Sequence, residues 1–360
     1  MLDQASFPRD KPCAGWVTPA ALEALELDAD EYRGSRVFQP ITAFVTGTVG
    51  AGAVQTDYVR AVSFGILRRE FDAYLLRRSR ARVCEGVRVE SLRRTPDGWV
   101  VNERFTAPVI VGAGGHFCPV ARALRPSANE PVVAAQEVEF RLDARQQAEC
   151  GVRAEAPELY FCGDLKGYGW CFRKEDRLNV GFGRSDRRVL TAHVRNFLAF
   201  LAERRRVPAD LPTRWKGHAY LLYETARRPL VGDRTLLVGD AAGLAYSCSG
   251  EGILPAIESG LLAAETVLAA RGRYDAADLE PYRRAVEHRL GRRQASRLPS
   301  WLTALIGRRL LAARWATRHL ILDRWFLHSR QPPLATAGGG LPAPQGTTGS
   351  RMWDGCRGSW

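Results

Sequence analysis

Several sequence features that mark common protein classes are missing from this 360-residue chain, and each absence excludes a class of protein or site. No uncharged apolar run reaches about 18 residues, so no transmembrane helix is predicted. The eight cysteines include no C-x-x-C pair, and the six histidines have no metal-ligand spacing. These patterns predict free thiols in a reducing cytoplasm and argue against a disulfide framework or a metal site. The polar start, residues 1–4, is not a signal peptide.

The most informative segment is residues 236–270. Apolar residues lead into Gly239-Asp240, a turn of small residues follows, and the cluster Ser249-Gly250-Glu251-Gly252 opens a helical stretch near Ile253. We therefore expect a strand, a tight loop and a helix. Glycines let a flat or phosphorylated ligand approach the backbone, and a helix start offers unpaired N–H donors. The segment predicts a nucleotide-like cofactor site with Asp240 accepting hydroxyl hydrogen bonds.

These residues resemble the FAD-dependent oxidoreductases with a glutathione-reductase-type FAD fold, in their geranylgeranyl-reductase-like branch. The resemblance implies that Asp240, in the segment Gly239–Gly243, binds the ribityl or pyrophosphate region of FAD. It also implies that Gly250 and Gly252 form the turn beneath the isoalloxazine ring. A generic strand-loop-helix of another α/β protein is the alternative.

Further positions match the family over most of residues 1–330. Asp3 would be the acid for the adenosine ribose, and Lys11-Pro12-Cys13 would be the loop that returns to the flavin. Cys13 is a weak candidate for a catalytic residue, and the family's usual glycine after it is Ala14 here. The sequence Arg68-x-x-Phe71-Asp72 matches a family motif in which Arg68 contacts the cofactor; two solvated helix arginines are the alternative. The catalytic acid is not identified.

One expected element is missing. A dinucleotide fold starts with a strand, G-x-G-x-x-G and a helix, with the ribose acid roughly 20 residues further on, yet that acid would be Asp3 here. The glycines of residues 47–52 have the wrong spacing. Gly112 and Gly114 instead resemble a later strand-turn of the family that contacts the cofactor, although Gly114 replaces its aspartate. We hypothesise that Met1 is an internal Met of a longer protein and that roughly 30 residues precede it.

An aromatic stripe is predicted at residues 165–173. Strand alternation would place Tyr168, Trp170 and Phe172 on one side as a wall. The stripe resembles the reductases' Tyr-x-Trp-x-Phe-Pro motif, which implies that these three residues bind substrate, although Arg173 replaces the proline. An ordinary aromatic core is the alternative interpretation.

The fold expected is α/β, with a doubly wound FAD/NAD(P)-binding sheet interleaved with a mostly antiparallel β substrate domain and a C-terminal helical region. The FAD domain would be discontinuous and would lack its first βα unit. It comprises residues 1–32, 67–125 and 226–283, and the substrate domain comprises residues 33–66 and 126–225. A basic helical region is placed at 284–330 and a disordered tail at 331–360. Strands are expected at 83–93 and 99–105.

Charge is uneven along the chain, whose formal net charge is +13 with 48 arginines and only four lysines. Residues 284–330 hold eleven arginines against two acids, with many apolar side chains between them. They form either a helical cap packed on the FAD domain or a surface for peripheral contact with an anionic membrane. No nucleic-acid partner is predicted, because no such motif accompanies the charge.

Three functions remain in view. The first is an FAD-dependent oxidoreductase that reduces or dehydrogenates an apolar, isoprenoid or lipid-like small molecule, with NADPH or NADH as electron donor. The second is a flavin-dependent monooxygenase or halogenase. The third is a truncated, non-catalytic remnant that no longer binds FAD. The sequence leaves the substrate, the oligomeric state and the proton donor open.

Overall fold

The largest sheet has seven strands in the order β14-β10-β13-β12-β11-β3-β4. All neighbours are antiparallel except β11 and β3, which confirms the prediction of a largely antiparallel sheet. The computed structural model describes residues 1–124, 130–186, 190–293, 307, 309–311, 313–329 and 331–334. In chain order the strands are β3 (Ala43–Thr48), β4 (Ala53–Asp57), β10 (Val132–Arg141), β11 (Glu158–Phe161), β12 (Gly167–Lys174), β13 (Arg177–Arg184) and β14 (Lys216–Leu221).

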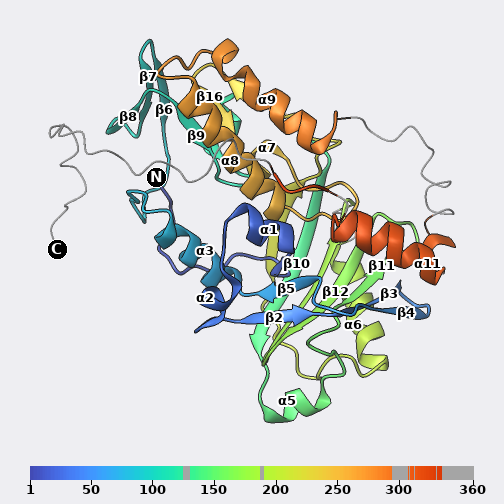
Figure 1. Ribbon diagram of the computed structural model, residues 1–360. Helices are drawn as coiled ribbons and strands as arrows, with labels where there is room; N and C mark the ends of the chain where they lie inside the picture. Colours follow the sequence, from blue (N-terminus) through green and yellow to red (C-terminus); the bar gives the residue numbers. More distant parts are fainter. Residues whose placement is uncertain are drawn as a thin grey trace, which may run out of the picture.

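The two faces of this sheet bury different side chains because successive residues of a strand point to opposite sides. Cys171 and Phe182 belong to a core cluster shared with α6 (Leu190–Glu203). On the other face, Trp170 and Phe172 pack in a cluster that contains five buried aromatic rings, called the aromatic cluster below. The sheet is therefore covered on both sides, with α5 (Ala144–Glu149) beyond the end of β10 (Figure 1).

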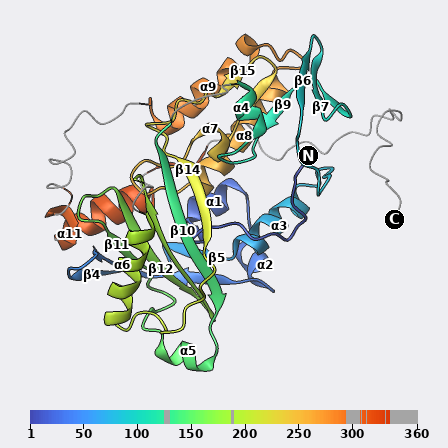
Figure 2. The same ribbon diagram turned by 180° about the vertical axis from the view of Figure 1, so that it is seen from behind.

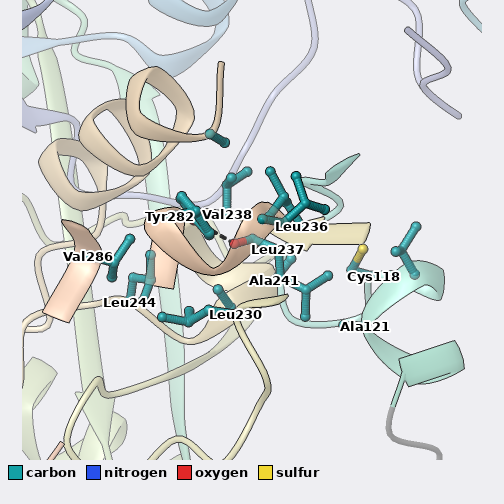
Figure 3. Close-up of a cluster of buried hydrophobic side chains, with 14 of the residues drawn as sticks. Cys118, Ala121, Leu230, Leu236, Leu237, Val238, Ala241, Leu244, Tyr282 and Val286 are labelled. Carbon is teal, nitrogen blue, oxygen red and sulfur yellow. Dashed lines mark hydrogen bonds between the residues drawn. The ribbon is translucent and has the colours of Figure 1, made fainter. Parts of the chain in front are cut away.

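A second unit contains the segment that the sequence singled out. Parallel strands β9 (Ile110–Gly112) and β16 (Thr235–Leu237) pair, and β15 (Val231–Gly232) adds an antiparallel edge. Around them lie α4 (Pro119–Leu124), α7 (Gly239–Ala242), α8 (Ile253–Ala269) and α9 (Ala276–Leu290). Tyr282 of α9 is fully buried and donates a hydrogen bond to the Leu237 carbonyl oxygen at 2.7 Å (Figure 3). This bond fixes α9 against the end of β16.

A third sheet, in the order β1-β5-β2, lies between these two units (Figures 1 and 2). Its strands are β1 (Trp16–Val17), β2 (Phe38–Ile41) and β5 (Ser63–Ile66), with helices α1 (Pro19–Ala24), α2 (Ala29–Arg33) and α3 (Arg68–Arg78) nearby. Tyr32 and Phe71 anchor a shared core of these elements. Residues 33–66, expected to lie in one domain, thus contribute to two sheets.

The predicted strands at 83–93 and 99–105 were wrong in their bounds. The structure places β6 at Leu92–Thr95, β7 at Gly98–Val101 and β8 at Phe105–Ala107. The Asn102 side chain accepts hydrogen bonds from the backbone N–H groups of Glu90 and Ser91 at 2.8 and 3.2 Å, so this backbone is satisfied outside a strand ladder. Asn102 itself is left-handed, with φ of 52°, and turns the chain between β7 and β8.

The C-terminal segment packs on the aromatic face of the large sheet. Helix α11 (Arg314–Ala316) leads into a π-helix, η2 (Thr317–Phe326), at one end of the sheet beside β11 and β3 (Figures 1 and 2). Ile321, Leu322 and Phe326 of η2 are buried in the aromatic cluster. Among the described residues of the expected 284–330 region, the apolar side chains of η2 thus pack on the large sheet, whereas Val286 of α9 packs in the core of the second unit and His328 stacks on Tyr246. The predicted tail lies almost entirely outside the described residues. No helix in the described ranges is long and apolar enough to span a bilayer.

Candidate functional site

A cavity of about 360 Å³ lies where the three sheets approach one another. One part of its wall comes from α7 and the start of α8, a second from residues 11–16 and α3, and a third from β10, β12 and β14. Segments far apart in the sequence therefore form a single site.

The first wall begins directly after β16. Gly239 has φ of +53°, and a Cβ there would lie 2.9 Å from the Ala256 Cβ, so glycine allows α7 to approach α8 closely. The next residue, Asp240, lines the cavity, and its Oδ2 is 3.5 Å from His218 Nε2. Burial raises the pKa of Asp240, but the His218 contact and the charge of Lys11 outweigh it, so the pKa lies below its usual value. Asp240 is a half-buried, ionised hydrogen-bond acceptor.

The same wall continues at the start of α8. Gly250 has φ of +72°, and a Cβ there would lie 2.5 Å from the Tyr220 hydroxyl, so any other residue would strain the backbone and displace the Tyr220 side chain. Gly252 is the N-cap of α8 and offers no side chain to the helix N–H groups. Both glycines line the cavity. This wall therefore presents exposed backbone and the positive end of a seventeen-residue helix.

The second wall is cationic. Arg68 lies at the start of α3 and donates two hydrogen bonds of 2.9 Å to the carboxylate of Asp72, which also lies 3.3 Å from Arg9. Lys11 lines the cavity as well, and burial together with the charge of Arg68 lowers its pKa. This corner of the site suits an anionic group.

Cys13 lies in a loop that polar side chains of the large sheet hold in place. Its N–H donates to Glu137 Oε1 at 2.7 Å, and its carbonyl oxygen accepts from Asn179 Nδ2 at 3.2 Å. Lys174, whose side chain is 1% exposed, donates to the carbonyl oxygens of Ala14 and Ile66 at 2.9 and 3.0 Å and pairs with Glu139. Side chains of the large sheet thus hold the loop that carries Ala14, the residue that stands where the family has glycine.

The third wall is the aromatic stripe of β12. Tyr168, Trp170 and Phe172 all line the cavity, as alternation predicted. The Tyr168 hydroxyl donates to the Ser249 carbonyl oxygen at 2.5 Å, and Trp170 Nε1 donates to Asn179 Oδ1 at 2.7 Å. Each polar atom is therefore bonded, and the ring faces remain as an apolar surface.

Most residues expected to bind the cofactor meet here, but three do not. Asp3, Gly112 and Gly114 are not among the residues that line the cavity. Asp3 Oδ1 accepts from the Ala5 N–H at 2.9 Å. A Cβ at Gly112 would lie 2.6 Å from a Leu237 methyl group, so close packing against Leu237 explains the glycine at this position. The cofactor roles of all three residues stay predictions.

The sequence did not point to several cavity residues, among them Glu137, His218 and Tyr220. One signal was present: Glu137 and Glu139 are two apart in an otherwise largely apolar strand, which places two carboxylates on one face. No comparable signal marked His218, which lies beside Ala135 only through strand pairing. Among the described residues, no three His, Cys, Asp or Glu side chains are grouped to hold a metal.

The sequence resembles several characterised reductases, although no family model matches it. It is 29% identical over 291 residues to the chloroplastic geranylgeranyl diphosphate reductase of Oryza sativa subsp. japonica, covering 72% of this chain and 59% of that protein. Over 189 residues it is 31% identical to the geranylgeranyl diphosphate reductase of Synechocystis sp., covering 51% and 45%. It is also 27% identical to a menaquinone reductase of Mycobacterium tuberculosis, covering 74% and 69%. This chain thus spans less than two thirds of the two geranylgeranyl diphosphate reductases.

Solved structures share the architecture at low sequence identity. A geranylgeranyl bacteriochlorophyll reductase-like protein from Thermoplasma acidophilum superposes with a TM-score of 0.67 at 18% identity, covering 87% of this chain and 81% of that one. A halogenase, PltM, in complex with FAD gives 0.62 at 16% identity, covering 91% and 80%. These comparisons confirm the expected fold: the chain shares the fold of the geranylgeranyl-reductase-like protein and of the halogenase PltM, which was solved with FAD.

Proposed function

We propose that this chain is an FAD-dependent oxidoreductase that reduces carbon–carbon double bonds in an apolar, isoprenoid or lipid-like small molecule. The observation that supports it is one continuous cavity with two chemically different halves. The half at Asp240, Gly250 and Gly252 suits a polar, flat cofactor. The half at Trp170 and Phe172 suits a hydrocarbon chain.

The residues present fit the flavin and ribityl part of FAD. Asp240 is an ionised acceptor for ribityl hydroxyl groups, and Arg68 and Lys11 supply positive charge for a phosphate. At Gly250 and Gly252 the backbone is bare, which lets a planar ring lie against the start of α8. When bound and reduced, FAD supplies a hydride to the substrate.

The remaining chemistry belongs to the protein. The aromatic wall binds and orients the hydrocarbon, and its buried rings exclude water from the double bond. Tyr168 is tied to Ser249, so the wall and the α8 turn keep a fixed separation. A proton must also reach the second carbon of the reduced double bond, and the protein must supply it.

The test begins with cofactor binding by the purified chain. We expect added FAD to show quenched fluorescence and a shifted visible spectrum on binding. Asp240→Asn should weaken binding, whereas Asp278→Asn on α9, which does not line the cavity, should not. Failure of the wild type to bind FAD would refute the proposal and favour the non-catalytic interpretation.

The second step separates reductase from monooxygenase. Under anaerobic conditions, NADPH or NADH should reduce the bound flavin. Geranylgeranyl diphosphate and a menaquinone, chosen from the names of the similar proteins, should then reoxidise it with saturation of a double bond. Reoxidation that requires oxygen and inserts an oxygen or halogen atom would instead establish the alternative, which the fold of the halogenase PltM keeps open. Peripheral membrane contact through residues 284–330 remains a separate proposal.

A further inference from the structure

Glu251 lies where the two halves of the cavity meet. It stands between Gly250 and Gly252 at the start of α8, and the neighbouring Ser249 carbonyl oxygen is the acceptor of the Tyr168 hydroxyl. Its side chain is therefore next to both the Gly250–Gly252 backbone, where the flavin ring is expected, and the aromatic wall.

The two carboxyl oxygens of Glu251 have different surroundings. Oε1 accepts a hydrogen bond from the Leu254 N–H at 2.8 Å, in the first turn of α8. Oε2 is buried and has no hydrogen-bond partner among the described residues. Because the carbonyl oxygen of a carboxylic acid is a better hydrogen-bond acceptor than its hydroxyl oxygen, the proton on this carboxyl group belongs on Oε2. The helix thus orients the acid so that its O–H is free of competing protein acceptors.

The surroundings favour the protonated acid at neutral pH. Burial, followed by the negative charges of Glu258 and Asp240, outweighs the helix N–H bonds and raises the pKa of Glu251 to about 7. Tyr168 and Tyr246 are the other titratable groups that face it, and both stay neutral because burial raises their pKa values. The neighbouring carboxylate of Glu258 is itself bonded to the guanidinium of Arg289.

Other cavity groups are less suited to donate a proton. Glu137 accepts hydrogen bonds on both oxygens, from the Cys13 N–H at 2.7 Å and from Asn179 at 3.3 Å. Asp240 has a lowered pKa and stays ionised. The Tyr168 hydroxyl already donates to a carbonyl oxygen.

We propose that Glu251 is the catalytic acid of the double-bond reduction, a role that rests on the proposed function. In this step the Glu251 Oε2–H bond would break and its proton would form a C–H bond at one alkene carbon, while reduced FAD bound in the cavity would supply a hydride to the other carbon. The alkene would gain two electrons from the reduced flavin, and the nicotinamide donor would return two electrons to the flavin. Glu251 would be left as a carboxylate and would regain a proton from water.

The experiment compares Glu251→Gln, Glu251→Asp and Glu265→Gln in the full chain. Glutamine keeps the acceptor for the Leu254 N–H but cannot donate a proton of suitable acidity, so the start of α8 is retained. Glu265 lies on the same helix but does not line the cavity, which makes Glu265→Gln the matched loss of one charge.

The first measurement needs no substrate and no turnover. A pH-difference infrared spectrum of the protein should contain a carboxylic acid C=O band that titrates near pH 7. We expect Glu251→Gln to lose this band and Glu265→Gln to retain it. A band that survives in Glu251→Gln would overturn the assignment, because the neutral-range acid would then be another residue.

The second measurement separates the two half-reactions. Glu251→Gln should bind FAD and accept electrons from NADPH or NADH at the wild-type rate. Its anaerobic reoxidation by the polyprenyl substrate should be slower by about 10²- to 10⁴-fold, with partial rescue in Glu251→Asp. If wild type and Glu251→Gln are reoxidised equally fast, only the Glu251 assignment fails. If wild type binds FAD but no polyprenyl or quinone substrate reoxidises it, the proposed function fails, and the assignment with it.

Discussion

Replacing Lys174 by methionine should destabilise the protein strongly, although the residue lies within the sheet and not in the cavity. The Lys174 ammonium is buried and has three acceptors: the carbonyl oxygens of Ala14 and Ile66 and the carboxylate of Glu139. Glycine at position 15 is required beside it, since a Cβ there would lie 2.6 Å from Nζ and 2.2 Å from the Ile66 oxygen. Methionine keeps most of the volume and removes the charge and all three donors.

The magnitude follows from what the change leaves behind. Removing one partner of a buried ion pair costs about 3–5 kcal/mol, because the other charge stays without compensation. The Glu139 side chain is 27% exposed and regains some hydration, which favours the lower end. The two carbonyl oxygens lose a donor in addition. We expect a loss of about 3 kcal/mol in the free energy of unfolding.

The chain supplies a close control. Lys216 pairs with Asp10 at 2.9 Å, with side chains 52% and 58% exposed, so Lys216→Met makes the same chemical change at the surface. Such pairs contribute about 0–1 kcal/mol. Urea unfolding followed by tryptophan fluorescence measures both variants, and the double variant Lys174→Met/Glu139→Gln should recover part of the loss because it removes the unpaired carboxylate.

Equal losses of unfolding free energy in Lys174→Met and Lys216→Met would refute this reasoning. So would a double variant that is no more stable than Lys174→Met. Because Lys174 also fixes the loop of Ala14 in the cavity wall, Lys174→Met should weaken FAD binding under native conditions, whereas Lys216→Met should not.

Three other outcomes follow from the structure. Phe326→Ala should cost about 3–5 kcal/mol because this ring is 1% exposed and stacks on Trp16, whereas Trp315→Ala, at 68% exposure, should change the unfolding free energy by less than about 0.5 kcal/mol. Because the pKa of Glu251 is raised to about 7, the folded state keeps a proton between about pH 4.5 and 7 that the unfolded state has lost. The contribution of this proton to the free energy of unfolding, about 3 kcal/mol, is present below pH 4.5 and is lost as the pH rises through 7. Across this pH range, the free energy of unfolding should decline less steeply in Glu251→Gln than in the wild type. An equal decline in both would contradict the raised pKa of Glu251. Gly250→Ala should impair FAD binding and stability together because its Cβ would meet the Tyr220 hydroxyl, and normal binding by this variant would contradict the geometry.

Local sequence patterns predicted several parts of this structure correctly. The left-handed turns at Gly239 and Gly250, the start of α8 at Ile253 and the aromatic alternation of β12 appear where expected, whereas the short helix α7 lies in the segment expected to be a loop. Each depends on interactions within a few residues: backbone conformation at glycine, the first turn of a helix, and the twofold alternation of a strand. The predicted strand before β6 failed because a side chain from residue 102 satisfied its backbone, which no local pattern reveals.

The sequence by itself therefore determined the kinds of element and the fold family, because these follow from short-range spacing and from motifs. Only the tertiary structure decided which walls meet around the cavity. Glu137 and His218 reach the site through strand pairing between segments tens of residues apart, and Lys174 reaches the supporting loop through hydrogen bonds to Ala14 and Ile66. Their roles come from burial and from the charges that packing brings near them. Neither quantity exists in the extended chain, so neither is contained in local sequence patterns.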